Sequence, residues 1–103
     1  MRVLNDVEIA TFRSDGVVCL PGAVDKALVA EILESVDRLI ESPGRFGGSM
    51  TTQTASGMFF QDRYLHPTHQ DFHRYARDCG LAISAATATG SSKIHLYYDH
   101  VFV

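Results

Sequence analysis

The chain has 103 residues and a formal net charge of −3, with 46% hydrophobic and 20% charged residues. This length fits one domain or part of one, and the scattered Lys and Arg residues form no basic patch of the kind that binds nucleic acid. No apolar run reaches the roughly 18 residues of a membrane span, the N-terminus lacks the apolar core of a signal peptide, and two cysteines are too few for a disulfide framework. We therefore expect a cytoplasmic protein with reduced thiols and without a nucleic-acid or membrane partner.

The N-terminal segment predicts a helix followed by a short strand. Asn5 with Glu8 three residues later is the pattern of a capping box, which predicts a helix over about 6–14 that Gly16 ends. The apolar run 17–20 is bounded by turn residues, as in a short strand.

A second helix is predicted near 26–41. Asp25 is a suitable N-cap, and apolar residues recur every three or four positions with charged residues on the opposite side. The predicted apolar face consists of Leu28, Val29, Ile32, Leu33, Val36, Leu39 and Ile40.

The segment 42–57 is rich in Gly, Ser and Thr and shows no period, so we interpret it as a long loop. Its glycines resemble a phosphate-binding loop, but the lysine of a Walker motif is missing. Loops of this length in a compact domain often cover a binding site.

The second half predicts two helices and a strand. Helical spacing covers 67–79, where Pro67 suits the first turn, and Gly80 separates this helix from another over 81–88. The segment 93–103 alternates throughout and predicts a strand. One face of that strand would carry Ile94, Leu96, Tyr98, His100 and Phe102.

The stretch HPTHQDFH at 66–73 contains a His-x-Asp pattern, His69 to Asp71, that resembles half of an iron site. If 67–79 is a helix, these two side chains lie roughly 200° apart around its axis and cannot bind one metal ion. His69 and His73, at i and i+4, could share a divalent ion such as zinc, although no third ligand is apparent. His66 is interpreted as a helix-entry residue.

The remaining chemical candidates are few. Cys19 in the short strand and Cys79 on an apolar helix face are both expected to be buried, inert thiols. Asp99 and His100 are neighbours on a strand, so they face opposite ways and form no dyad. His100 interrupts an apolar face, which fits either a core histidine with one hydrogen bond or a polar group in a binding pocket.

Three segments in the same order, FRSDGVVCLPGAVDKALVAEIL, FFQDRYL and GSSKIHLYYDHVFV, resemble the N-terminal third of the phytanoyl-CoA dioxygenase family. Its members are non-haem Fe(II), 2-oxoglutarate-dependent oxygenases built on a double-stranded β-helix, or jelly roll. The resemblance covers most of the chain. It implies an α+β fold in which a helical layer over 1–90, with a short strand at 17–20, packs on the first jelly-roll strand, 93–103.

The resemblance also implies where a site would lie. Tyr98, His100 and Phe102 would line the pocket near 2-oxoglutarate, and His100 would contact this cosubstrate. The family's iron-binding His-x-Asp follows a Lys-x-Pro-Gly turn that would come after Val103. No catalytic residue and no metal ligand is therefore expected in this chain, which we expect to be inactive alone and to self-associate through an unfinished strand edge. Phe59, Gln61 and Asp62 would approach the pocket from outside, and the loop 42–57 would lie near its mouth.

The function implied is the hydroxylation of a small organic substrate or an acyl-CoA. Two alternatives come from the residues alone. One is a short, non-catalytic α+β module that binds a ligand at His100 or at the loop 42–57. The other is a helical metal-binding domain that uses His69 and His73.

Overall fold

The computed structural model describes residues 2–49 and 57–103, and within them the chain forms helices and one antiparallel sheet. The elements in chain order are α1 (Asp6–Asp15), α2 (Lys26–Glu41), β1 (Gly48–Ser49), β2 (Phe60–Arg63), α3 (Gln70–Asp78), α4 (Leu81–Thr89) and β3 (His100–Phe102). The strand order is β1-β2-β3, with β2 in the centre. The α+β expectation is therefore confirmed.

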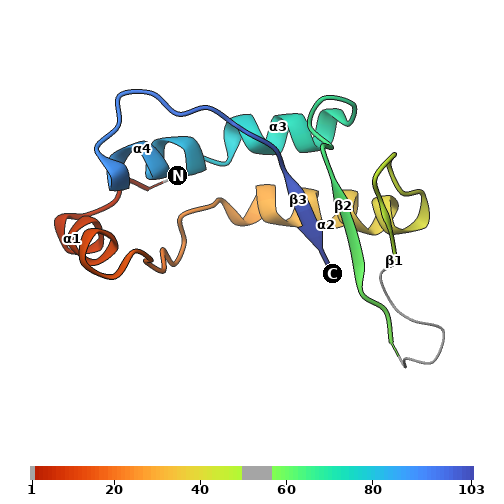
Figure 1. The fold of residues 1–103 in the computed structure, drawn as a ribbon, viewed down its shortest axis with the longest axis horizontal. Coiled ribbons are helices and arrows are strands. Elements are labelled where there is room, and N and C mark those ends of the chain that lie inside the picture. Colours follow the sequence, from red (N-terminus) through yellow and green to blue (C-terminus); the bar gives the residue numbers. More distant parts are fainter. Residues whose placement is uncertain (1, 50–56) are drawn as a thin grey trace.

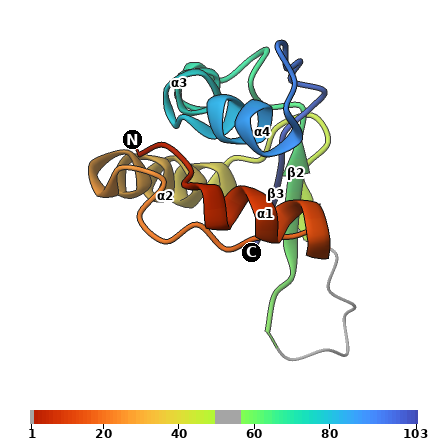
Figure 2. The ribbon, with the colours of Figure 1, turned by 90° about the vertical axis from the view of Figure 1, so that its left-hand side faces the viewer.

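The arrangement has two ends (Figure 1). The helices α2 and α3 pack side by side and the sheet crosses them, while α1 packs on α4 at the other end. Figure 2, viewed along the long axis, shows the sheet beside the helices rather than between them. The radius of gyration is 15.9 Å, larger than the about 13 Å typical of a 100-residue domain, so the molecule is elongated.

The core lies where α2, α3 and the sheet meet. Its buried side chains are Leu39, Phe60, Leu65 and Phe72. The partly buried residues packed against them are Ile32, Val36, Ile40 and Val101. By contrast, α1 contains no buried residue, so the sheet end supplies most of the hydrophobic stabilisation.

The helix predictions with local capping signals are confirmed. Asn5 accepts a hydrogen bond from the Glu8 N–H at 2.9 Å while the Glu8 carboxylate accepts one from the Asn5 N–H at 3.0 Å, and left-handed Gly16 ends α1. The Asp25 carboxylate caps α2. The helix predicted over 81–88 is α4.

The predicted strand at 17–20 is wrong. This segment has no ladder partner among the described residues, and Cys19, expected to be buried, is exposed. A short apolar run becomes a strand only where another strand is within pairing distance. Cys79 is buried, as expected.

The helix predicted over 67–79 begins later, at Gln70, with His69 as an N-cap of extended backbone. The preceding residues form a turn in which the Thr68 and His69 N–H groups both bind the Leu65 carbonyl, at 3.1 and 2.8 Å. Pro67 therefore lies in this turn and not in the first turn of the helix.

Two sheet predictions also need correction. Phe60–Arg63, expected within a helical layer, is the central strand, and β3 is shorter than the predicted strand 93–103. The strand β2 has only four residues, and its ladder with the last segment extends from Asp99 to Val103. Residues 93–98 therefore have no backbone partner in that ladder. The strand β1 falls within the loop predicted over 42–57, and residues 50–56 of that loop lie outside the described part.

Within the described residues, every helix is too short or too polar to cross a membrane.

Candidate functional site on the open face of the sheet

The two faces of the sheet differ in what covers them. Along β2, Phe60 and Asp62 are buried toward the helices, whereas Gln61 and Arg63 point to the other side. In the antiparallel register, Gln61 is paired with Phe102 and Arg63 with His100. Paired residues share a face, so these four side chains define what we call the open face.

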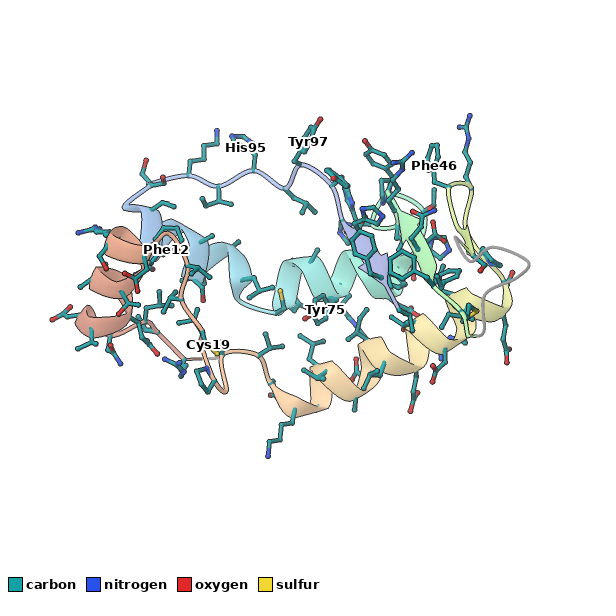
Figure 3. The ribbon with its side chains drawn as sticks, turned by 60° about the horizontal axis from the view of Figure 1, so that its bottom comes forward. Phe12, Cys19, Phe46, Tyr75, His95 and Tyr97 are labelled. Carbon is teal, nitrogen blue, oxygen red and sulfur yellow. The ribbon has the colours of Figure 1, made fainter. Side chains whose placement is uncertain are left out.

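An aromatic row follows the open face. Tyr98, His100 and Phe102 share it as predicted, with ring centroids 6.1 Å and 4.0 Å apart. The complete row is Phe46, Tyr64, Tyr98, His100, Phe102 and Phe59, and successive centroids are 4.0 to 6.1 Å apart. Figure 3 shows several ring side chains gathered over β2 and β3, near the labelled Phe46.

The row is accessible. Apart from His100, which is half-buried, its rings are between 39% and 59% exposed. A contiguous exposed patch of this kind indicates a surface that contacts a ligand or another polypeptide.

His100 is held by a defined chain of hydrogen bonds. The Gln61 amide NH₂ donates to the Phe46 carbonyl at 2.8 Å, and the Gln61 Oε1 lies 3.0 Å from the His100 Nε2. A carbonyl can only accept, so the Phe46 carbonyl fixes the orientation of the Gln61 amide. The amide oxygen then requires a proton on the His100 Nε2, and a neutral His100 therefore presents its Nδ1 as an acceptor.

Tyr64 has a left-handed backbone with φ of 55°. For a residue with a side chain this conformation costs roughly 1–2 kcal/mol. It turns the chain at the end of β2 and places the Tyr64 ring between Phe46 and Tyr98, at 5.4 and 5.2 Å. Strain of this kind is found disproportionately at functional sites.

Asp62 lies on the covered face, opposite the aromatic row. It is completely buried and accepts hydrogen bonds from the Gly44 N–H at 2.7 Å and the Arg63 N–H at 2.8 Å. A Cβ on Gly47 would lie 2.3 Å from the Asp62 Oδ2. Asp62 thus holds the loop that carries Phe46, whereas Gln61 and Phe59 approach the row directly.

Asp99 faces away from His100, as expected of strand neighbours. Its carboxylate accepts from the Leu65 N–H at 2.7 Å and the His66 N–H at 2.9 Å, and it lies 3.3 Å from the His66 Nδ1. Asp99 therefore holds the turn between β2 and α3 and is not available for chemistry at the row. His66 belongs to this turn, close to the helix-entry role predicted for it.

The His-x-Asp residues have separate partners. The Asp71 carboxylate accepts from the Ser35 hydroxyl and from Arg38, both at 2.8 Å, and these hydrogen bonds, the Ser35 bond foremost, lower the pKa of Asp71. The His69 Nδ1 lies 2.9 Å from the Thr68 hydroxyl. Because His69 precedes the helix, the two residues do not occupy opposite helical faces as predicted, but Asp71 is committed to joining α2 and α3.

No group of three His, Cys, Asp or Glu side chains is placed to hold a metal ion in the part of the chain that the structure describes. His69 and His73 are joined by a backbone hydrogen bond at the start of α3.

The upstream half of the predicted strand face does not join the row. Ile94 and Leu96 instead line a cleft of about 450 Å³ against α3 and α4, where buried Cys79 also lies. His95 and Tyr97 also line this cleft, with their side chains projecting outward from the last segment in Figure 3.

Sequence reasoning missed two members of the site and one of its contacts. Gln61 was expected near the pocket without its bond to His100, and Phe46 and Tyr64 were not singled out. The alternation Phe60, Gln61, Asp62, Arg63 is a signal for β2 that could have placed Gln61 on the same face as His100.

A comparison of the chain with known protein families, with curated proteins and with solved structures finds no match.

Proposed function

We propose that this chain is the N-terminal part of a cytoplasmic non-haem Fe(II), 2-oxoglutarate-dependent dioxygenase that resembles the phytanoyl-CoA dioxygenase family. In this proposal the open face becomes part of the inner wall of a jelly roll. The observation that carries the proposal is the asymmetry of the sheet, which has helices on one face and an accessible aromatic row with a hydrogen-bonded histidine on the other. A jelly roll that binds a ligand between its sheets can use such an open face as its lining.

The outer edge of β3 supports further strand pairing. Phe60 and Val103 exchange both backbone hydrogen bonds, at 2.9 and 3.0 Å. Hydrogen-bonded pairs alternate along an antiparallel ladder, so the N–H and C=O groups of His100 and Phe102 point away from β2. A further strand can pair with these groups.

His100 is the residue that would contact the cosubstrate. When its ring is protonated, the Nδ1–H can donate to a carboxylate of 2-oxoglutarate while the Nε2–H stays bonded to Gln61. Tyr98 and Phe102 flank the His100 ring, with centroids 6.1 and 4.0 Å away.

Iron does not fit the residues of this chain, because the described ranges 2–49 and 57–103 contain no cluster of three metal-binding side chains. In the proposal the ligands follow Val103, and the iron and 2-oxoglutarate together supply the oxidising chemistry that hydroxylates a small organic substrate or an acyl-CoA.

The first test is to read the natural transcript beyond the Val103 codon. An in-frame continuation into a Lys-x-Pro-Gly turn and a His-x-Asp pattern is expected, and a stop codon would overturn the proposal. In the longer protein, His100→Ala should raise the KM for 2-oxoglutarate. His95→Ala removes an exposed histidine outside the row and should leave that KM unchanged.

The free edge gives a second test, on the 103-residue chain itself. We expect it to self-associate through β3 in sedimentation experiments. Phe102→Pro removes an outward N–H and should reduce this association without breaking a bond to β2. Val101→Pro, at a position bonded to β2, should instead destabilise the fold. A monodisperse monomer at high concentration would contradict the expectation.

The second candidate is a non-catalytic module that binds a ligand on the aromatic row. It is favoured by the hydrophobic core on the covered face, which packs β2 and β3 against α2 and α3. A stop codon after Val103 together with a cooperative, monomeric unfolding transition would favour this candidate.

A further inference from the structure

Two arginines beside the aromatic row have no acidic partner in the part of the chain that the structure describes. Four of the other arginines bind carboxylates, in the pairs Arg2–Glu8, Arg38–Asp71, Arg74–Glu31 and Arg77–Asp78. Arg45 and Arg63 form no such pair within the described residues, and the segment 50–56 contains no Asp or Glu. We call Arg45 and Arg63 the arginine pair.

The arginine pair converges on one ring. The guanidinium carbons of Arg45 and Arg63 each lie 5.4 Å from the centroid of Phe46, so the two charges are at most twice that distance apart. Arg63 also lies 5.9 Å from the centroid of Tyr64. Contact with aromatic rings stabilises each cation, but two like charges this close still repel each other.

A cleft of about 230 Å³ lies beside the pair. One wall is formed by Gly44, Arg45 and Phe46, the second by Arg63 and Tyr64 at the end of β2, and the third by the turn 65–69. Thr68 and His69 also line the third wall, where the Thr68 hydroxyl lies 2.9 Å from the His69 Nδ1. The cleft thus combines two cations and hydrogen-bonding groups with aromatic surface.

The positions of these groups are fixed by hydrogen bonds and by the backbone of Tyr64. Asp62 holds the Gly44 N–H, the Gln61 amide holds the Phe46 carbonyl, and the strained backbone of Tyr64 directs its ring toward Phe46. Arg45 therefore projects from an anchored loop and Arg63 from the central strand. Such anchoring lowers the entropy that binding would otherwise cost.

We infer that the arginine pair binds the phosphate group of a phosphate ester that also carries a planar ring. Guanidinium groups bind phosphate oxygens in bidentate, charge-assisted geometry, and a dianionic phosphate cancels the repulsion between Arg45 and Arg63. The ring of the ligand then packs on Tyr64, which is 41% exposed. The cleft lies next to His100 but is not lined by it, and the inference does not depend on the proposed oxygenase function.

The test is a calorimetric titration of the 103-residue chain with adenosine monophosphate, inorganic phosphate and adenosine. The monophosphate should bind more tightly than either of the other two, because only it offers both the charge and the ring. Equal affinity for the monophosphate and inorganic phosphate, or for the monophosphate and adenosine, would overturn the inference.

Variants locate the site. Arg63→Gln should weaken binding of the monophosphate about tenfold or more, since one charge-assisted hydrogen bond is worth roughly that factor. Arg45→Gln, on an exposed loop, should have a similar effect with little risk to folding. Arg77→Gln removes the same charge from a residue paired with Asp78 on α3 and should leave binding unchanged. Equal losses in Arg63→Gln and Arg77→Gln would show a non-specific charge effect and refute the site.

Discussion

The two faces of the small sheet are built from the same strands and have opposite physical roles. On the covered face, Phe60 is 2% exposed and Asp62 is fully buried, and both are in contact with groups from other elements. On the open face, Phe102 is 59% exposed and contacts mainly other rings of the row. Residues that alternate along one strand thus divide between holding the fold together and presenting a surface.

Because of this difference, substitutions on the covered face should change stability, and substitutions on the open face should change binding. Apolar burial stabilises by about 25 cal/mol per Å² removed from water, so the covered face carries most of the folding free energy of the sheet. The open face contributes less to the folding free energy, because its aromatic rings remain largely accessible to solvent.

The largest expected loss of stability comes from a substitution on the covered face. Phe60→Ala should lower the free energy of unfolding by about 3–5 kcal/mol, because it leaves a cavity between α2, α3 and β2. Phe102→Ala, a matched change on β3, should cost less than about 1 kcal/mol. Urea denaturation followed by circular dichroism measures both. Similar losses in the two variants would show that the faces are not distinct in stability.

The next effect tests the close approach of the loop to Asp62. Gly47→Ala should destabilise by about 1–3 kcal/mol, because its Cβ would overlap the buried carboxylate. In an Asp62→Ala background the same change should cost less, since the carboxylate is gone. A double-mutant cycle gives this coupling directly, and additive losses would argue against the contact.

An intermediate effect is expected on the unfolding free energy at acid pH. The pKa of Asp71 is lowered by hydrogen bonds from Ser35 and then Arg38. Its stabilising contribution is therefore complete above the ordinary Asp pKa of about 3.9 and is lost as the pH falls below that value through the folded-state pKa. Asp71→Asn should make the unfolding free energy less dependent on pH in this acid range. Unfolding of the unaltered chain over the same pH range is the reference, and an equal pH dependence in both proteins would argue against this role of Asp71.

The smallest effect on stability is expected on the open face, at the Gln61–His100 hydrogen bond. Gln61→Ala should change the unfolding free energy by no more than about 1 kcal/mol, but it removes the group that fixes the His100 tautomer. Ring ¹⁵N chemical shifts of neutral His100 should show the Nε2–H form in the unaltered chain and a mixture in the variant. Identical shifts in both proteins would mean that Gln61 does not control the ring.

The sequence predicted well what local chemistry determines. The Asn5–Glu8 box and the Asp25 cap lie within one helical turn of their partners, so α1 and α2 could be placed closely. Alternation likewise put Tyr98, His100 and Phe102 on one face.

The parts that sequence reasoning missed depend on distant residues. A strand needs a partner strand. The four residues of β2 limit how far β3 can pair, and no described strand lies beside residues 17–20. Asp62 binds the loop 18 residues before it, and Phe46 joins the row only because that loop folds back over β2. No period or capping signal encodes such contacts.

The loop anchored by Asp62 has a consequence for how the protein can diversify. Gly44 and Gly47 are fixed by the space beside the carboxylate, whereas the side chains of Arg45 and Phe46 between them point outward. Related chains could therefore exchange the two central residues freely while retaining both glycines and the aspartate. Selection for a new ligand would act on this dipeptide without disturbing the stability on which the rest of the molecule depends.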